Sequence, residues 1–332
     1  MSAEQPLTAN PIEGRSPFEL RVNQSRAVPE SAVKKALESG DMGFLHSFTT
    51  GSTVDGPGVR LVAWTAGCQW RCLYCHNPDT WNMTNGMPVT LERATDELRK
   101  YSHGLKVMSG GLTLSGGEPL MQDRFAVKFF TAAKAMGVHT TVETNGFLGE
   151  RLTDEELDKI DLVMLGIKSW DPEKHRHLTG KDIGPTLDFA RRLAARKRPM
   201  WVRFVLVPGL TDDASDLAHS AKFIAGLGNV ERVEVLPFHQ LGRYKWKELE
   251  INYKLEGVEP PTSALAEWAC GMFRAEGLNA FCFGRLIVKV LTPGRSTRHS
   301  HPFIASDELN PQKSRILLSL ALLKSGPKAD IQ

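Results

Sequence analysis

The chain has 332 residues, of which 41% are hydrophobic and 24% charged, a composition typical of a folded globular protein rather than a disordered or fibrous one. Its formal charge is only +3, so the chain as a whole lacks the basic surface expected of a nucleic-acid partner. The first residues lack the features of a secretory signal and no stretch suggests a membrane span. We therefore expect a cytoplasmic protein that binds neither nucleic acid nor membrane.

Residues 1 to about 40 are rich in Ser, Pro, Glu and Asn, which is typical of a partly ordered extension. From Gly43 onward, apolar β-prone runs alternate with helical patterns, which predicts an α/β protein with a parallel sheet. The strands are expected at 59–66, 111–116, 138–144, 161–168, 200–207 and 230–238. The helices are expected at 91–102, 123–137, 153–160, 186–197 and 212–228. This repetition predicts a TIM-type (β/α)6 barrel, complete or incomplete.

The strand and helix pattern stops after Phe283, where the sequence becomes polar and rich in turn-forming residues. A final amphipathic stretch, 313–325, is too short to span a bilayer and is interpreted as a packing helix. We therefore divide the chain into an N-terminal extension (1–40), a partial barrel (41–283) and a C-terminal tail (284–332).

The five cysteines fall into two groups. Cys68, Cys72 and Cys75 lie within eight positions, whereas Cys270 and Cys282 lie far away among apolar residues. An odd number of cysteines with three crowded together argues against a disulfide framework and for reduced thiolates. The two distant cysteines are interpreted as buried small hydrophobic residues.

The crowded cysteines have the spacing C-x3-C-x2-C and follow an apolar strand. Three thiolates can hold three irons of a [4Fe–4S] cluster and leave the fourth iron open to another ligand. The alternative is a zinc site whose fourth ligand is His76, Cys270 or Cys282. The cysteines alone leave both interpretations open.

Further motifs in the sequence favour the iron–sulfur cluster over the zinc site. With the cysteine loop they resemble the radical S-adenosylmethionine superfamily, and within its glycyl-radical-enzyme activating family the pyruvate formate-lyase-activating enzymes. The resemblance extends from about residue 43 to 281. The segments that carry it are TVDGPGVR (53–60), CLYCHNPDTW (72–81), SGGEPL (115–120), ETNGF (143–147), VRFVLVPGLTDD (202–213) and LPFHQLGRYKW (236–246).

The resemblance implies one [4Fe–4S] cluster on Cys68, Cys72 and Cys75, with S-adenosylmethionine as cosubstrate. Reductive cleavage of that cosubstrate would produce a 5'-deoxyadenosyl radical, which takes a hydrogen atom from a glycine of a second protein, pyruvate formate-lyase. A flavodoxin or ferredoxin is expected to supply the electron, and the chain is expected to act as a monomer. The alternatives are an activator of another glycyl-radical enzyme, a small-molecule radical enzyme and a non-enzymatic zinc protein. Activators of other lyases often carry a ferredoxin-like insertion, which this chain lacks between Trp81 and Thr90.

The resemblance also assigns residues to the methionine end of the cosubstrate. Gly116, Gly117 and Glu118 follow the second predicted strand and are expected to bind its amino group through close backbone approach. Glu143 and Thr144 follow the third strand and offer oxygen atoms to the same end. Without the resemblance, the first of these segments would be read as a tight turn.

Five other residues are expected, by resemblance, to line the rest of the cosubstrate. Lys168 and Arg203 are expected near its carboxylate and ribose, and Arg203 would be costly to bury without an anion. Tyr74 and His76 are expected to border the adenine, and His239 to lie against the cosubstrate in a binding role. A strand-end lysine in solvent and a structural histidine are the alternatives.

Two further expectations concern a cation and the protein partner. The family binds a monovalent cation through acidic residues, but Gly166 stands where one of them is usual, so only Glu143 remains to compensate. Asp55 and Gly56 lie in a Pro-Gly turn, and the resemblance places this loop at the mouth of the barrel, where the partner polypeptide enters.

Overall fold

A computed structural model of the chain describes residues 19–20, 35 and 37–283, all within one compact unit. The expected C-terminal helix at 313–325 lies outside the described residues, as does most of the N-terminal extension. No helix in the described part of the chain is long and apolar enough to cross a membrane.

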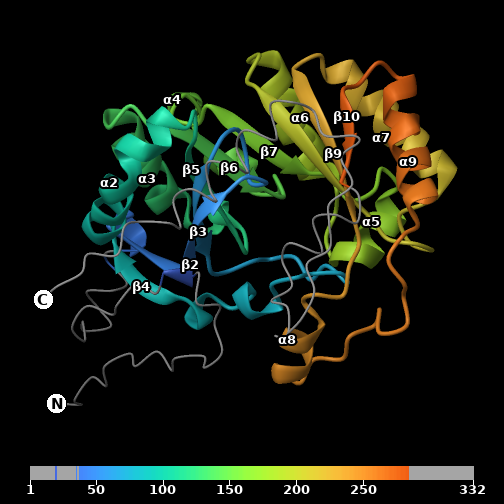
Figure 1. The fold of residues 1–332 in the computed structure, drawn as a ribbon, viewed down its shortest axis with the longest axis horizontal. Coiled ribbons are helices and arrows are strands. Elements are labelled where there is room, and N and C mark those ends of the chain that lie inside the picture. The colour runs from blue at the N-terminus through green and yellow to red at the C-terminus, as the bar shows by residue number, and fades with distance from the viewer. Residues whose placement is uncertain (1–18, 21–34, 36, 284–332) are drawn as a thin grey trace, which may run out of the picture. The chain divides into compact units, whose positions relative to one another are not determined.

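Six parallel strands form the centre of the fold and neighbour each other in sequence order (Figure 1). Their runs of buried residues are typical of parallel strands that are covered on both faces. All six coincide with the expected strands. They are β3 (Arg60–Thr65), β5 (Gly111–Gly116), β6 (His139–Thr144), β7 (Leu162–Gly166), β8 (Met200–Leu206) and β9 (Val230–Pro237).

Four additional strands extend the sheet at its two edges. β2 (Met42–Ser52) pairs antiparallel with β3 and also carries β1 (Glu19–Leu20) and β4 (Met87–Thr90), whereas β10 (Ala280–Cys282) pairs parallel with β9. Among the described residues, β1 and β10 at the ends of the sheet do not pair with each other. The barrel is therefore incomplete.

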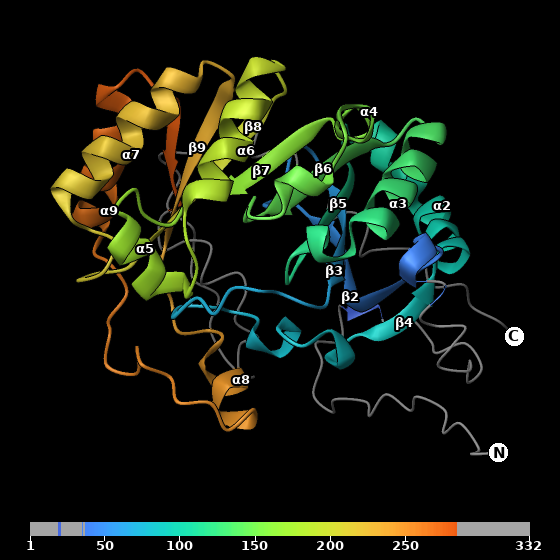
Figure 2. The ribbon, with the colours of Figure 1, turned by 180° about the vertical axis from the view of Figure 1, so that it is seen from behind.

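The longer helices cover the outer face of this curved sheet (Figures 1 and 2). Five helices coincide with the expected ones: α2 (Leu91–Val107), α3 (Asp123–Ala135), α4 (Asp154–Leu157), α6 (Gly184–Ala195) and α7 (Ala214–Leu227). Three more were not expected: α5 (Pro172–Thr179), α8 (Arg243–Glu248) and α9 (Ser263–Ala275). The expected cap of α4 is present, since Thr153 and Glu156 form a capping box.

The main core fills the layer between the helices and the sheet. Phe125, Phe129 and Phe130 of α3 are fully buried in it, and Phe204 of β8 packs against Phe273 of α9. Burial of each such side chain contributes roughly 2 kcal/mol relative to exposure. This layer holds the strands so that their carboxyl ends meet at one edge of the sheet.

The inside of the barrel is polar at the level where β3 begins. Arg60 is fully buried there, and its guanidinium donates to the hydroxyls of Thr113 and Thr141, each at 2.9 Å, and to the carbonyl oxygen of Leu112. Neutral oxygen acceptors thus satisfy a buried charge that would otherwise be costly. Arg60 cross-links three neighbouring strands from within.

The expectation that Cys270 and Cys282 are free is wrong. They form a disulfide, with their Cα atoms 6.2 Å apart. Cys270 lies on the buried face of α9, and β10 returns along the same helix after a short turn. The fold therefore brings together two apolar positions that appear unrelated in the sequence.

Candidate functional site

The loop between β3 and β4 carries the three crowded cysteines and is closed at its base by its own backbone. The N–H of Gly67 donates to the carbonyl of Thr80 at 2.7 Å, and the N–H of Cys68 donates to that of Trp81 at 3.1 Å. Gly67 has φ +92°, which favours glycine at the point where the chain leaves the strand. The Asp-Thr-Trp segment at 79–81 therefore orders the loop.

Cys68, Cys72 and Cys75 are free and partly buried. Burial, followed by the neighbouring Cys72, raises the pKa of the Cys75 thiol to about 12, and burial likewise raises the pKa of Cys68 and Cys72. Burial therefore favours the neutral thiol at all three positions.

The fourth ligands considered for a zinc site all have other partners in the structure. Of the fourth ligands considered, Cys270 and Cys282 are joined in a disulfide. The third, His76, packs its ring on His239 and contacts that residue's carbonyl oxygen through Nε2.

The GRYKW segment at 242–246 holds the outer side of the cysteine loop. The indole N–H of Trp246 donates to the carbonyl of Cys75 at 2.9 Å, and its ring contacts Trp81 edge-on at 5.0 Å. The Lys245 ammonium lies 3.0 Å from the Asp79 carboxylate. The sequence singled out this segment only as part of the resemblance, and gave its Lys and Trp no role.

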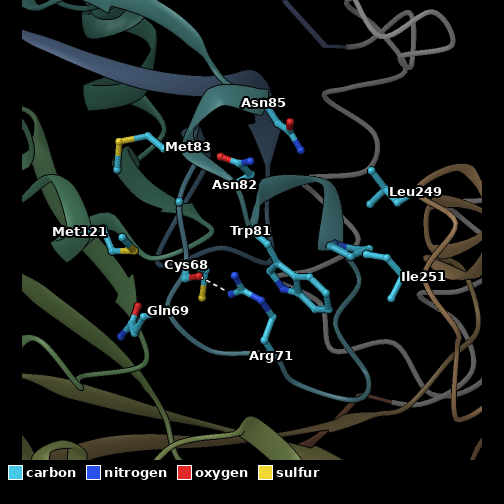
Figure 3. A pocket seen from close by; sticks show the side chains of 12 residues that line it. Cys68, Gln69, Arg71, Trp81, Asn82, Met83, Asn85, Met121, Leu249 and Ile251 are labelled. Carbon is cyan, nitrogen blue, oxygen red and sulfur yellow. Dashed lines mark hydrogen bonds between the residues drawn. The ribbon is translucent and has the colours of Figure 1, made fainter. Parts of the chain in front are cut away.

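A pocket of about 540 Å³ borders the same loop (Figure 3). Cys68 is the only one of the three free cysteines that lines it. The Arg71 guanidinium donates to the Cys68 carbonyl at 2.6 Å and lies over the Trp81 ring at 5.0 Å. Leu249 and Ile251 line the pocket next to Trp81, so its wall is mixed apolar and cationic.

The glycines that end β5 press directly on the base of the cysteine loop. A Cβ at Gly117 would lie 2.3 Å from the Gly67 carbonyl oxygen, and one at Gly116 would lie 2.4 Å from backbone atoms of Thr65. The N–H of Glu118 donates to the same Gly67 carbonyl at 2.7 Å. The close backbone approach that the structure shows here is to the protein's own loop.

The Glu118 side chain is fully buried and accepts hydrogen bonds from its own protein. Oε1 accepts from the Thr144 hydroxyl at 2.7 Å and the Leu120 N–H at 3.0 Å, and Oε2 accepts from the Asn145 N–H at 2.8 Å. Burial raises the pKa of Glu118 to about 7, although these three donors oppose the shift. Glu118 thereby connects the ends of β5 and β6.

Arg203 lies inside the barrel and contacts carboxylates, which agrees with the expectation that it faces an anion. Its Nη1 lies 2.7 Å from Glu143, its Nε lies 3.0 Å from Glu234, and Asp55 lies 3.6 Å away. Burial raises the pKa of Asp55, whereas Arg203 and Ser115 hold the pKa of Glu143 low despite its burial. The sequence missed Glu234, although a charged residue in an apolar strand is the same signal that identified Arg203.

Asp55 is buried rather than displayed at the surface. Its carboxylate accepts a hydrogen bond from the Ser52 hydroxyl, and the carbonyl of the preceding Val54 accepts one from Arg203. The φ of +128° at Gly56 turns the chain back toward β3. The loop that the sequence assigned to a partner thus contacts the charged interior of the barrel.

The expected adenine residues meet beside Cys75. The rings of His76 and His239 stack with centroids 3.9 Å apart, and burial lowers the pKa of His76 to about 3, so this ring is neutral. Tyr74 packs in a second apolar cluster with Phe238 and Trp246. Its hydroxyl is buried and has no hydrogen-bond partner among the described residues.

Comparison with known proteins gives concordant results. The radical SAM superfamily profile matches residues 62–222. A pyruvate formate-lyase-activating enzyme of Listeria monocytogenes is 46% identical over 226 residues, which cover 66% of this chain and 91% of that one. A pyruvate formate-lyase 1-activating enzyme of Escherichia coli is 42% identical over 238 residues, which cover 71% and 97%.

Solved structures support the fold. Streptococcus suis SuiB bound to its precursor peptide SuiA matches with a TM-score of 0.51 at 14% identity, over 67% of this chain and 48% of that one. The partial barrel, the cysteine loop and the superfamily match define a radical SAM enzyme. At 42–46% identity over nearly the whole length of these relatives, the chain belongs to the pyruvate formate-lyase-activating enzyme family.

Proposed function

We propose that this chain activates pyruvate formate-lyase by introducing a glycyl radical under anaerobic conditions. The observation that carries the proposal is the closed loop that holds three free cysteines, on a chain 46% identical to an enzyme of that name. When bound, a [4Fe–4S] cluster and S-adenosylmethionine supply a one-electron cleavage that yields methionine and a radical able to take hydrogen from glycine.

Cys68, Cys72 and Cys75 would hold the cluster, because they are free and lie together in one loop. The hydrogen bonds of Gly67 and Cys68 to residues 80 and 81 keep this loop in place. Three protein ligands would leave one iron available for the amino and carboxylate groups of the cosubstrate.

The remaining assignments follow the surroundings of the loop. Tyr74, His76 and His239 would form the adenine side, which is supported by the stacked imidazoles and the unpartnered hydroxyl of Tyr74. The methionine side would be formed by Gly116, Gly117, Thr144 and Glu143. Because protein donors occupy the Glu118 carboxylate, Glu118 would act as a positioning residue.

The interior charges would orient the cosubstrate and receive the partner. Arg203 and Lys168 would provide positive charge toward the cosubstrate carboxylate and ribose, with Arg203 held in place by Glu143 and Glu234. Asp55 and Gly56 would meet the glycine-bearing peptide of the partner after it enters the open barrel. The surrounding protein excludes water that would quench a radical.

The biological setting is proposed from the same chemistry. We place the protein in the cytoplasm as a monomer, with a flavodoxin or ferredoxin as the electron donor. Reducing surroundings would keep the three loop thiols available for iron. The partial barrel would comprise residues 41–283, between the two terminal extensions.

The test is electron paramagnetic resonance of the anaerobically reconstituted protein mixed with pyruvate formate-lyase, S-adenosylmethionine and dithionite. We expect a glycyl radical doublet, and none with Cys72→Ala. Formation of 5'-deoxyadenosine without a doublet would redirect the proposal to another glycyl-radical enzyme or a small-molecule substrate. A colourless protein that holds zinc and cleaves no cosubstrate would refute both enzymatic readings.

A further inference from the structure

The resemblance implies a monovalent cation near the cosubstrate, and the residues present do not fit it. Gly166 has no side chain to offer where an acidic residue is usual. Both oxygens of Glu143 are already engaged, Oε1 by Arg203 at 2.7 Å and Oε2 by the Ser115 hydroxyl at 2.6 Å.

The Lys168 side chain fills the space left by Gly166. A Cβ at Gly166 would lie 2.9 Å from Nζ of Lys168, closer than Cβ atoms are found, and 3.2 Å from its Cε, a tight contact. The backbone carbonyl oxygen of Thr144 is 3.6 Å from the same point. A side chain at 166 would therefore push the flexible end of Lys168 away from this point.

The ammonium is free to act on a ligand. Lys168 is only partly buried, and it forms no ion pair within 4 Å with any carboxylate of the described residues. The point that a Cβ of residue 166 would occupy lies close to both the ammonium and the Thr144 carbonyl, so Lys168 lies beside the end of β6.

We propose that the Lys168 ammonium supplies, in this chain, the positive charge that a bound monovalent cation would otherwise provide, so that S-adenosylmethionine binding needs no alkali metal ion. One exchange, from an acidic residue to Gly166, both removes a cation ligand and opens the space for the ammonium. The lysine ammonium carries the same single positive charge as a potassium ion. Because it is covalently attached to the chain, it does not have to be bound from solution. This inference rests on the proposed function only in taking S-adenosylmethionine as the cosubstrate.

The first experiment measures S-adenosylmethionine affinity and 5'-deoxyadenosine formation by the full-length reconstituted protein with dithionite. Potassium chloride and choline chloride are compared at equal ionic strength, without a glycyl-radical enzyme. For the wild type, the S-adenosylmethionine affinity and the rate of 5'-deoxyadenosine formation are expected to differ by less than twofold between the two salts. A tenfold or greater loss of affinity in choline chloride would overturn the proposal.

Variants at residue 166 test whether the ammonium and a metal ion exclude each other. Gly166→Asp is expected to displace Lys168 and weaken cosubstrate binding at least tenfold in choline chloride, with recovery in potassium chloride. The matched control Gly166→Asn, which has nearly the same size and no charge, is expected to show the loss without the recovery. A Gly166→Asp variant that keeps wild-type affinity in both salts would contradict the inference.

Lys168→Met should weaken cosubstrate binding at least tenfold, and unchanged affinity would also refute the proposal. Thallium-205 NMR on the cluster-free proteins provides a readout that is independent of activity. Line broadening is expected with Gly166→Asp and absent with the wild type, whereas equal broadening would overturn the proposal. Because none of these assays contains the partner, a failure to form a glycyl radical would bear on the proposed function alone.

Discussion

Nη1 of Arg203 on β8 lies 2.7 Å from Oε1 of Glu143 on β6, and this pair spans the intervening strand β7. Nε of the same guanidinium lies 3.0 Å from Glu234 on β9. One side chain therefore joins three strands inside an incomplete barrel and holds in place Glu143, a residue of the proposed cosubstrate site.

Arg203→Met should lower the free energy of unfolding of the cluster-free protein by about 3 kcal/mol, because it leaves buried carboxylates without their counter-charge. Urea titration followed by circular dichroism measures the change. Arg191→Met is the control, since Arg191 forms an exposed pair with Asp188 worth less than about 1 kcal/mol. Equal losses in the two variants would show that the interior pairs do not hold the barrel.

Cys72→Ala should abolish iron binding and all cosubstrate cleavage, whereas Cys270→Ala should retain both. The first variant removes a thiol of the cysteine loop, and the second removes only the link between α9 and β10. Iron and sulfide analysis after anaerobic reconstitution, with product analysis under dithionite, distinguishes them. If both variants lost the cluster equally, the ligand set proposed here would be incorrect.

Gly117→Ala should reduce iron incorporation severely, because its Cβ would meet the carbonyl of Gly67 at 2.3 Å and backbone atoms cannot move aside easily. Gly226→Ala is the matched control. Gly226 lies inside α7 with nothing near its Cβ position, so alanine should stabilise the protein by up to about 1 kcal/mol. Iron content and thermal unfolding measure the two effects, and normal iron loading of Gly117→Ala would argue against the contact.

His139 should make the cluster-free protein less stable in mild acid. Burial and then the Arg60 charge lower its pKa to about 4, whereas in the unfolded chain it is about 6.5. The unfolded state therefore binds a proton first, and stability falls as the pH drops from about 6.5 to about 4.

His139→Asn should keep an acceptor for Arg60, because Oδ1 can replace the Nδ1 that lies 3.3 Å from the guanidinium. Between about pH 6.5 and about pH 4, the free energy of unfolding of the variant should fall by about 2 kcal/mol less than that of the wild type. Urea unfolding at a series of pH values tests this, with exposed His219→Asn as the control. A wild-type pH slope in His139→Asn would assign the acid sensitivity to other groups.

Local patterns predicted the central strands and most helices because apolar runs and caps act over a few residues. β2 was not predicted because its sequence, MGFLHSFTTGS, mixes glycine and hydroxyl residues with the apolar ones. Pairing with β3 makes this segment a strand. The disulfide was not predicted because its cysteines come together only when α9 packs against β10. Such tertiary pairings have no local signal.

The candidate site divides in the same way. The cysteine spacing identified the loop, and the charge in a strand identified Arg203, because each signal lies within one segment. Two other features depend on tertiary structure. Trp246 reaches the carbonyl of Cys75 from a distant segment, and the Lys168 side chain occupies the position that a side chain at residue 166 would take. The sequence alone could name these residues without showing what each one touches.

The backbone closure between Gly67 and Thr80 bears on how the metallocentre is assembled. In small zinc modules, ligation drives the polypeptide into shape, and the apo form is a random chain. Here the hydrogen bonds that close the base of the loop join main-chain atoms and involve no thiol. The course of the loop therefore does not depend on its cysteine side chains alone.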